Sequence, residues 1–81
     1  MPRMSKEIVK FLRKKNNMTQ RDFAKAVNCS FALIALVEVG KRRITTNLET
    51  KIKNTFNLDD KQLSTIASVV EEISKGVHPF I

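Results

Sequence analysis

The residues best suited to chemistry in this sequence are cations, and the chemistry that they suit is the binding of phosphate. Residues 1–58 contain 13 Lys and Arg against 4 Asp and Glu (13 − 4 = +9), whereas residues 59–81 contain 2 against 4 (2 − 4 = −2). A concentrated positive field favours a polyanion such as nucleic acid, because neutralised phosphates release their counterions. A lysine-rich surface that serves only solubility is an equally good interpretation of the charge.

Patterns for catalysis or metal binding are lacking in the sequence. One cysteine, Cys29, cannot form an intramolecular disulfide, and with one histidine, His78, it cannot assemble a structural zinc site. There is no glycine-rich phosphate loop and no plausible pair of nucleophile and general base. We therefore expect no enzyme activity, no cofactor and no metal.

No apolar run approaches the length of a membrane span, and the start MPRMSKEIVK lacks the apolar segment of a signal peptide. We therefore expect a cytoplasmic protein without membrane association.

The elements that must position the cations are predicted to be helices, since Gly and Pro occur only twice each and no stretch alternates apolar and polar residues. Ser5 can cap a first helix that runs to about Asn16. Thr19 with Asp22 resembles a capping box that opens a second helix ending near Val27. Ser30 can cap a third helix, residues 31–39, which ends at Gly40.

Two further helices are expected. Thr46-Asn47-Leu48-Glu49 is typical of a capping box and would open the fourth. The fifth, at about residues 60–75, has a three-four spacing of apolar residues at Leu63, Ile66, Ala67, Val70 and Ile73. Residues 77–81 form a short tail. Because no linker or repeat divides the chain, we expect one domain over residues 1–81.

The segment from Gln20 to Val39 meets the constraints on two short helices that pack steeply across a three-residue turn. Ala24 is small where the helices approach, and Asn28 accepts a positive φ in the turn. Ile34 and Val37 can pin the following helix. The sequence thus predicts a helix-turn-helix unit at about residues 20–39.

Residues 11–58 resemble the helix-turn-helix domain of the Cro and phage-repressor family, the lambda-repressor-like or XRE type. The matching features are Arg13, the Thr19-Gln20 opening, Ala24, the Ser30 cap, Ile34, the Glu38-Val39-Gly40-Lys41 close and the threonines that follow. The resemblance implies an all-α, five-helix DNA-binding domain whose second and third helices form the DNA-binding unit. It implies a transcriptional regulator of repressor type in a bacterium or a phage-infected host cell.

The resemblance also assigns roles to individual residues. It implies an architectural ion pair between Arg13 and Glu38, and it implies that Gln20 holds a phosphate or supports the third helix. Lys41, Arg42 and Arg43 follow the third helix where the family contacts phosphate.

The third helix departs from the family pattern. Where the family carries polar side chains that contact base edges, this chain has Ser30, Phe31, Ala32, Leu33 and Leu36, with Ala35 beside them. Only Ser30 can exchange a hydrogen bond, although the apolar side chains could touch thymine methyl groups.

Two functions of this helix stay open. In the first, the protein binds double-stranded DNA, and the contact candidates are Gln20, Arg21, Ser30, Phe31, Ala32, Leu36, Lys41, Arg42 and Arg43, with Lys25 also on the exposed side of the second helix. In the second, it resembles phage antirepressors and binds a partner protein such as a repressor through Phe31, Ala32, Leu33 and Leu36. A third interpretation is that Phe31 or Leu33 folds back onto the core.

The fifth helix is longer than a minimal domain of this family needs. Its apolar stripe, with Phe80 and Ile81, could pack on a second copy and form a homodimer. The same stripe could instead complete the protein's own core.

Overall fold

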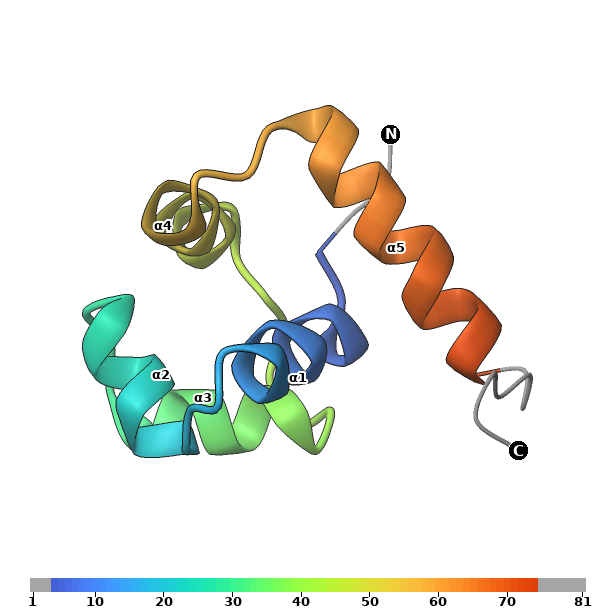
Figure 1. Cartoon of the computed structure of the whole chain (residues 1–81). Coiled ribbons are helices and arrows are strands. Elements are labelled where there is room, and N and C mark those ends of the chain that lie inside the picture. The colour runs from blue at the N-terminus through green and yellow to red at the C-terminus, as the bar shows by residue number, and fades with distance from the viewer. Residues whose placement is uncertain (1–3, 75–81) are drawn as a thin grey trace.

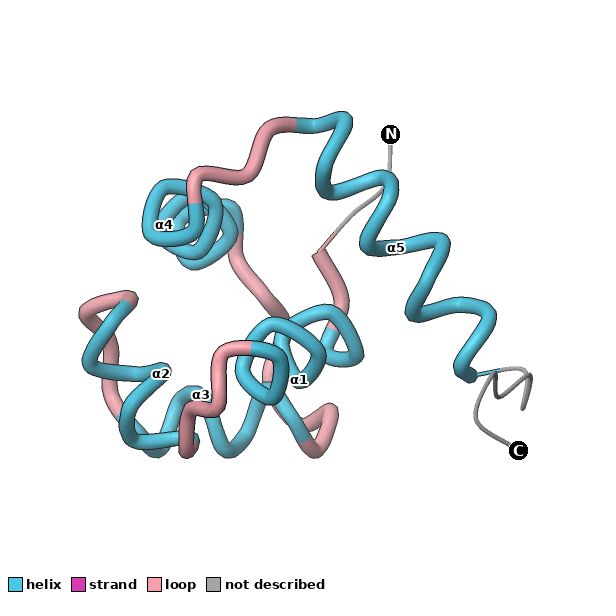
Figure 2. Tube along the Cα trace, in the orientation of Figure 1, coloured by secondary structure: helices cyan, strands magenta, loops and turns pink. Residues whose placement is uncertain are grey.

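The computed structural model describes residues 4–74, which form five α-helices and no strand (Figures 1 and 2). The helices are α1 (Lys6–Lys15), α2 (Gln20–Ala26), α3 (Phe31–Glu38), α4 (Thr46–Phe56) and α5 (Asp60–Ser74). The predicted all-α fold with five helices is confirmed. Lys75 and the tail at residues 77–81 lie outside the described residues.

The first three helices begin at the predicted caps. The Ser5 hydroxyl accepts a hydrogen bond from the Ile8 amide at 3.3 Å. Thr19 and Asp22 bond reciprocally, so the capping box of α2 is present. The Ser30 hydroxyl accepts from the Leu33 amide at 3.1 Å. These bonds satisfy backbone donors that a helix leaves unpaired at its first turn.

The capping box predicted for α4 is wrong by one residue. Thr45 is the cap, with extended backbone angles, and its hydroxyl accepts from the Leu48 amide at 3.1 Å. Thr46 is the first residue of the helix. Glu49 does not close a box, because its Oε1 accepts from the Met4 amide at 3.3 Å and so ties α4 to the beginning of the chain. Thr45 and Thr46 could each cap this helix. The structure has Thr45 as the cap, together with the contact between Glu49 and Met4.

The predicted start of α5 agrees with the structure. Asn57 ends α4 in the left-handed conformation (φ 53°). Asp59 and Gln62 then bond reciprocally, as the Gln62 amide donates to Asp59 Oδ1 at 2.7 Å and the Asp59 amide to Gln62 Oε1 at 3.2 Å. Asp60 also accepts from Lys53 Nζ of α4 at 2.9 Å.

The core lies around α1, which packs against α3 on one side and α5 on the other (Figure 1). Its most buried side chains come from all five helices and from the turn after α2: Ile8, Val9, Phe23, Val27, Ile34, Val37, Ile52 and Leu63. The rings of Phe23 and Phe56 stack with centroids 5.6 Å apart and join α2 to α4. This core holds α2 and α3 against α1, with the outer face of α3 left free.

The apolar stripe of α5 is divided between core and surface. Leu63 and Val70 are buried, and Ile66 and Ala67 pack against the core. Ile73 is exposed, as is the neighbouring Val69. The stripe therefore contributes largely to the protein's own core. Within residues 4–74, no helix has the length and apolar character needed to cross a membrane.

Candidate nucleic-acid interface

The turn between α2 and α3 has the geometry that the sequence predicts. Ala24 is buried at the crossing of the two helices, and its carbonyl accepts from the Cys29 amide at 2.9 Å. Asn28 has φ 58°, a conformation that asparagine tolerates better than most residues. Two bonds from α4 brace this turn: Lys51 Nζ donates to the Asn28 carbonyl and Thr55 Oγ1 to the Ala26 carbonyl, each at 3.3 Å.

A polar network beneath α3 joins the first three helices. Glu38 is 3% exposed, and its carboxylate accepts from Arg13 Nε at 2.7 Å and from Arg13 Nη2 at 2.9 Å. The pair that the family resemblance implies is therefore present and bidentate, the geometry in which arginine and carboxylate pair most strongly. Arg13 Nη1 donates to the Met18 carbonyl at 3.2 Å, which ties the pair to the chain before α2.

Gln20 is part of the same network. Its Nε2 donates to Glu38 Oε1 at 3.2 Å, so the first residue of α2 bonds to the last residue of α3. Of the two roles that the resemblance implies for Gln20, this bond matches the support of α3. No spacing pattern in the sequence indicates this bond, because a contact across 18 residues depends on how α2 and α3 pack.

The charge on Glu38 is stabilised where it lies. Burial would raise the pKa of this carboxyl, but hydrogen bonds from Arg13 and Gln20, with the positive charges of Arg13 and Lys10, outweigh burial and lower the pKa. The bond to Glu38 likewise raises the pKa of Arg13. Both groups stay ionised at neutral pH, and Glu38 presents no free carboxylate to a ligand.

The outward face of α3 is apolar. Phe31 is 40% exposed, Leu36 is 36% exposed, and Val39, directly after the helix, is 62% exposed. Ala32 is also exposed. We call these four residues the apolar face. Val39 was absent from the predicted contacts, although it lies seven residues after Ala32 and so returns to the same side of a helix.

Leu33 does not belong to this face to the extent predicted. It is half-buried and packs against the core, in line with the third interpretation of the sequence, so only part of its side chain is available to a partner. The physical reason is its angular position, since Leu33 lies four residues before the buried Val37 and therefore only about 40° from it around the helix. The alternative in which Phe31 folds onto the core does not match its exposure.

Phe31 makes a specific contact with α2. The Arg21 guanidinium carbon lies 4.6 Å from the centroid of the Phe31 ring, a cation–π contact at the start of α3. Arg21 is itself exposed. The sequence predicts each residue as a contact candidate separately, and the structure brings the two together.

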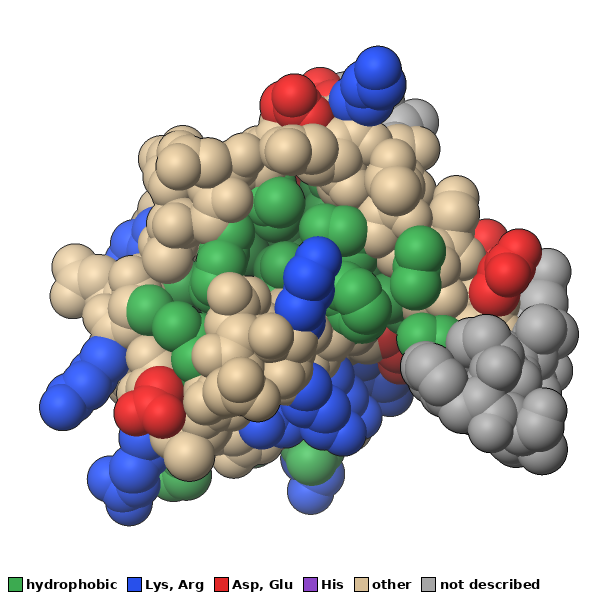
Figure 3. All heavy atoms as spheres, viewed as in Figure 1, with side chains coloured by type: hydrophobic (Ala, Val, Ile, Leu, Met, Phe, Trp, Pro, Cys, Tyr) green, Lys and Arg blue, Asp and Glu red, His purple; other side chains and the backbone are tan. Residues whose placement is uncertain are grey.

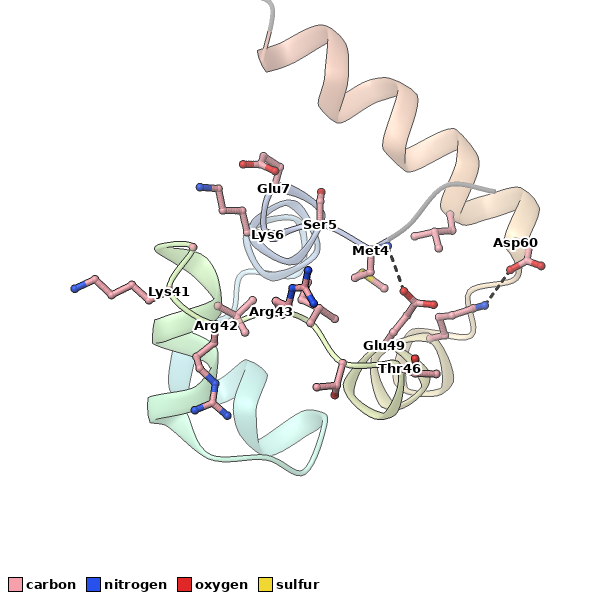
Figure 4. A pocket seen from close by; sticks show the side chains of 16 residues that line it. Met4, Ser5, Lys6, Glu7, Lys41, Arg42, Arg43, Thr46, Glu49 and Asp60 are labelled. Atoms are coloured by element: carbon pink, nitrogen blue, oxygen red, sulfur yellow. Dashed lines mark hydrogen bonds and ion pairs between the residues drawn. The ribbon is translucent and has the colours of Figure 1, made fainter.

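The remaining candidate cations lie around α3. Lys25 on α2 and Lys41, Arg42 and Arg43 after α3 are all exposed. In Figure 4, Lys41 and Arg42 extend outward from the loop, whereas the Arg43 side chain runs toward the start of α1, and all three line a polar groove with Lys6. In Figure 3 most basic side chains gather over α1 to α3, with one acidic side chain over α2, and the other acidic side chains in clear view lie at the two ends of α5.

Cys29 lies in the helix-turn-helix turn and is half-buried. Burial raises the pKa of its thiol, against a smaller opposing effect of the Lys51 charge. A thiol of raised pKa is a poor nucleophile at neutral pH, so Cys29 acts here as a packing residue.

A comparison with protein families gives one match. The helix-turn-helix family model matches residues 9–63, which are 55 of the 81 residues and extend from α1 into α5. Comparisons with curated proteins and with solved structures found no match. The matched range contains the Arg13–Glu38 pair, the turn at Asn28 and all of α3.

Proposed function

We propose that this chain, which belongs to the lambda-repressor-like (XRE) helix-turn-helix family of DNA-binding regulators, is a transcriptional regulator of phage or bacterial repressor type whose α3 docks on duplex DNA. Proteins of this family are typically regulators and not enzymes. The proposed operator contacts are Gln20, Arg21, Ser30, Phe31, Ala32, Leu36, Lys41, Arg42 and Arg43.

The observation that carries this proposal is that exposed cations flank α3 along the chain, on α2 before it and in the loop after it. Arg21 and Lys25 precede the helix on α2, and Lys41 and Arg42 follow it, all exposed. A duplex that received α3 in its major groove would bring a phosphate backbone to each side of the helix. Such contacts fix the position and register of the protein on DNA.

The proposal is tested by fluorescence anisotropy with a labelled duplex from the DNA beside its own gene and with a scrambled duplex of equal composition, over a salt series. We expect tighter binding to the native duplex. The Arg42→Ala/Arg43→Ala variant should lower the slope of log K against log salt by roughly two if both side chains contact phosphate. Lys61→Ala, an exposed cation on the acidic α5, is the matched control and should leave the slope unchanged. An unchanged slope in the double variant would remove the loop from the interface.

A second candidate function rests on the exposure of Phe31, Leu36 and Val39. Exposed apolar side chains gathered on one helix usually mark a protein contact. In this candidate the protein is an antirepressor whose apolar face, helped at its edge by Leu33, covers the DNA-binding domain of a repressor. Calorimetry with a repressor encoded beside its gene distinguishes the two, because Leu36→Glu would abolish such a complex.

We also propose that residues 1–81 act as one domain and that α5 supports a homodimer. The observation in favour of a dimer is the exposure of Val69 and Ile73, 43% and 44%, on the face of α5 that the core leaves uncovered. Two protomers would place two α3 helices on paired half-sites. A monomer by light scattering at high micromolar concentration would rule out the dimer.

A further inference from the structure

The polar groups of α3 are used inside the protein. Within Phe31–Glu38, Glu38 is the one residue with a polar side chain, and it is buried and bonded to Arg13 and Gln20. Ser30, at the cap, accepts from the Leu33 amide. Base edges are distinguished mostly by hydrogen bonds in the major groove, and α3 offers these groups almost nothing beyond the Ser30 hydroxyl.

One apolar group is available for such a helix to contact. In the major groove, the 5-methyl group of thymine is the apolar feature of the base pairs, and apolar side chains recognise it by contact. The apolar face has Phe31 and Ala32 at the start of α3 and Leu36 and Val39 about one and two turns later. These positions could reach more than one base pair along the groove.

Charge complementarity decides the occupant of this face. Arg21 on α2 contacts Phe31 at the start of this face, and Lys25 lies about one turn after Arg21. Lys41 and Arg42 follow Val39 at the end of the face, and all four cations are exposed. A polyanion that presents methyl groups between two phosphate backbones fits this arrangement.

The contact between Arg21 and Phe31 joins the two features. With its guanidinium carbon 4.6 Å from the ring centroid, Arg21 restrains the ring that begins the apolar face. Its own exposed charge remains able to meet a phosphate. Arg21 and Phe31 would then together set where the DNA backbone docks and where the Phe31 ring contacts a base.

We propose that the apolar face recognises thymine by its 5-methyl groups, so that sequence preference follows the pattern of methyl groups and not of hydrogen-bonding groups. The inference rests on the proposed binding of duplex DNA. It makes Phe31 and Leu36 the specificity-determining residues, with Ala32 and Val39 beside them.

The test compares one A·T-rich duplex with its copy in which deoxyuridine replaces thymine, since deoxyuridine lacks only the methyl group. A buried methyl group contributes about 0.8 kcal/mol, which corresponds to roughly a fourfold change in affinity per contact. Two or more contacts predict that wild-type protein binds the uridine duplex at least about tenfold more weakly by anisotropy. In Phe31→Ser/Leu36→Ser the ratio should fall below about twofold by the same estimate.

The matched control is Thr50→Ser, which removes an exposed methyl group from α4, outside both the apolar face and the proposed dimer surface, and should keep the wild-type ratio. Far-UV circular dichroism checks that each variant folds. Equal binding of both duplexes by the wild type would overturn methyl recognition and leave the proposed DNA binding intact. A ratio that persists in the double serine variant would assign the preference to DNA shape and also overturn it. Binding of neither duplex at low salt would overturn the proposed function itself and favour a protein partner.

Discussion

Replacing Glu38 by methionine removes the carboxylate that holds α1, α2 and α3 together. Glu38 is 3% exposed and accepts three hydrogen bonds, two from Arg13 and one from Gln20. Removing one partner of a buried ion pair costs about 3–5 kcal/mol, because the other charge stays behind uncompensated. Arg13 retains 17% side-chain exposure and its bond to the Met18 carbonyl, so we expect the lower end, about 3 kcal/mol.

This loss is large for a domain of this size. A chain of 81 residues has a stability of roughly 4–12 kcal/mol. With a urea slope of roughly 1.5 kcal/mol per molar, Glu38→Met should lower the midpoint of urea unfolding by about 2 M. Circular dichroism at 222 nm follows this transition.

A double-mutant cycle separates the pair from packing. Arg13→Met removes the other partner, and the double variant leaves no uncompensated charge, so it should be more stable than the sum of the single losses predicts, by about 1–3 kcal/mol. A loss below about 1 kcal/mol in Glu38→Met, or strict additivity in the cycle, would refute the view that this ion pair holds α3 in place.

The remaining predictions concern the same framework. Folding lowers the pKa of Glu38, so its contribution to the free energy of unfolding is fully present above the unfolded pKa, about 4.3, and is lost as pH falls through the lower folded value. Glu38→Gln should therefore flatten this part of the acid unfolding curve. Asn28→Ala should destabilise by about 1 kcal/mol because φ is 58°, whereas Asn28→Gly should be close to neutral; thermal unfolding compares the two. Ile34→Ala should cost about 2–5 kcal/mol in urea unfolding, since its side chain is 0% exposed, and Leu36→Ala, at the surface, less than about 0.5 kcal/mol; similar losses would contradict the assigned faces of α3.

Local chemistry made the helix boundaries predictable. Ser5, the Thr19 and Asp22 pair and Ser30 each satisfy backbone donors within three residues, so the sequence itself contains both partners. Asn28 is recognisable for the same reason, because its left-handed conformation is a property of the residue. The one displaced cap, Thr45 in place of Thr46, occurs where two adjacent residues could serve equally.

Contacts between distant residues were not predictable from sequence spacing. The bonds of Gln20 to Glu38 and of Met4 to Glu49 join residues 18 and 45 positions apart. They depend on the crossing angles of the helices, which tertiary packing sets. The half-burial of Leu33 and the contact of Arg21 with Phe31 have the same origin. The candidate residues could thus be found, but their roles required the packed structure.

In the proposed function, α3 and the cations that flank it in the chain form the surface that meets DNA. Amide chemical-shift mapping of uniformly ¹⁵N-labelled protein, titrated with a duplex at low salt, locates this surface residue by residue. We expect the largest changes on the first turn of α2, on Phe31 to Val39 and on Lys41 to Arg43. Changes confined to α5, or none at a duplex concentration that saturates the anisotropy signal, would contradict it.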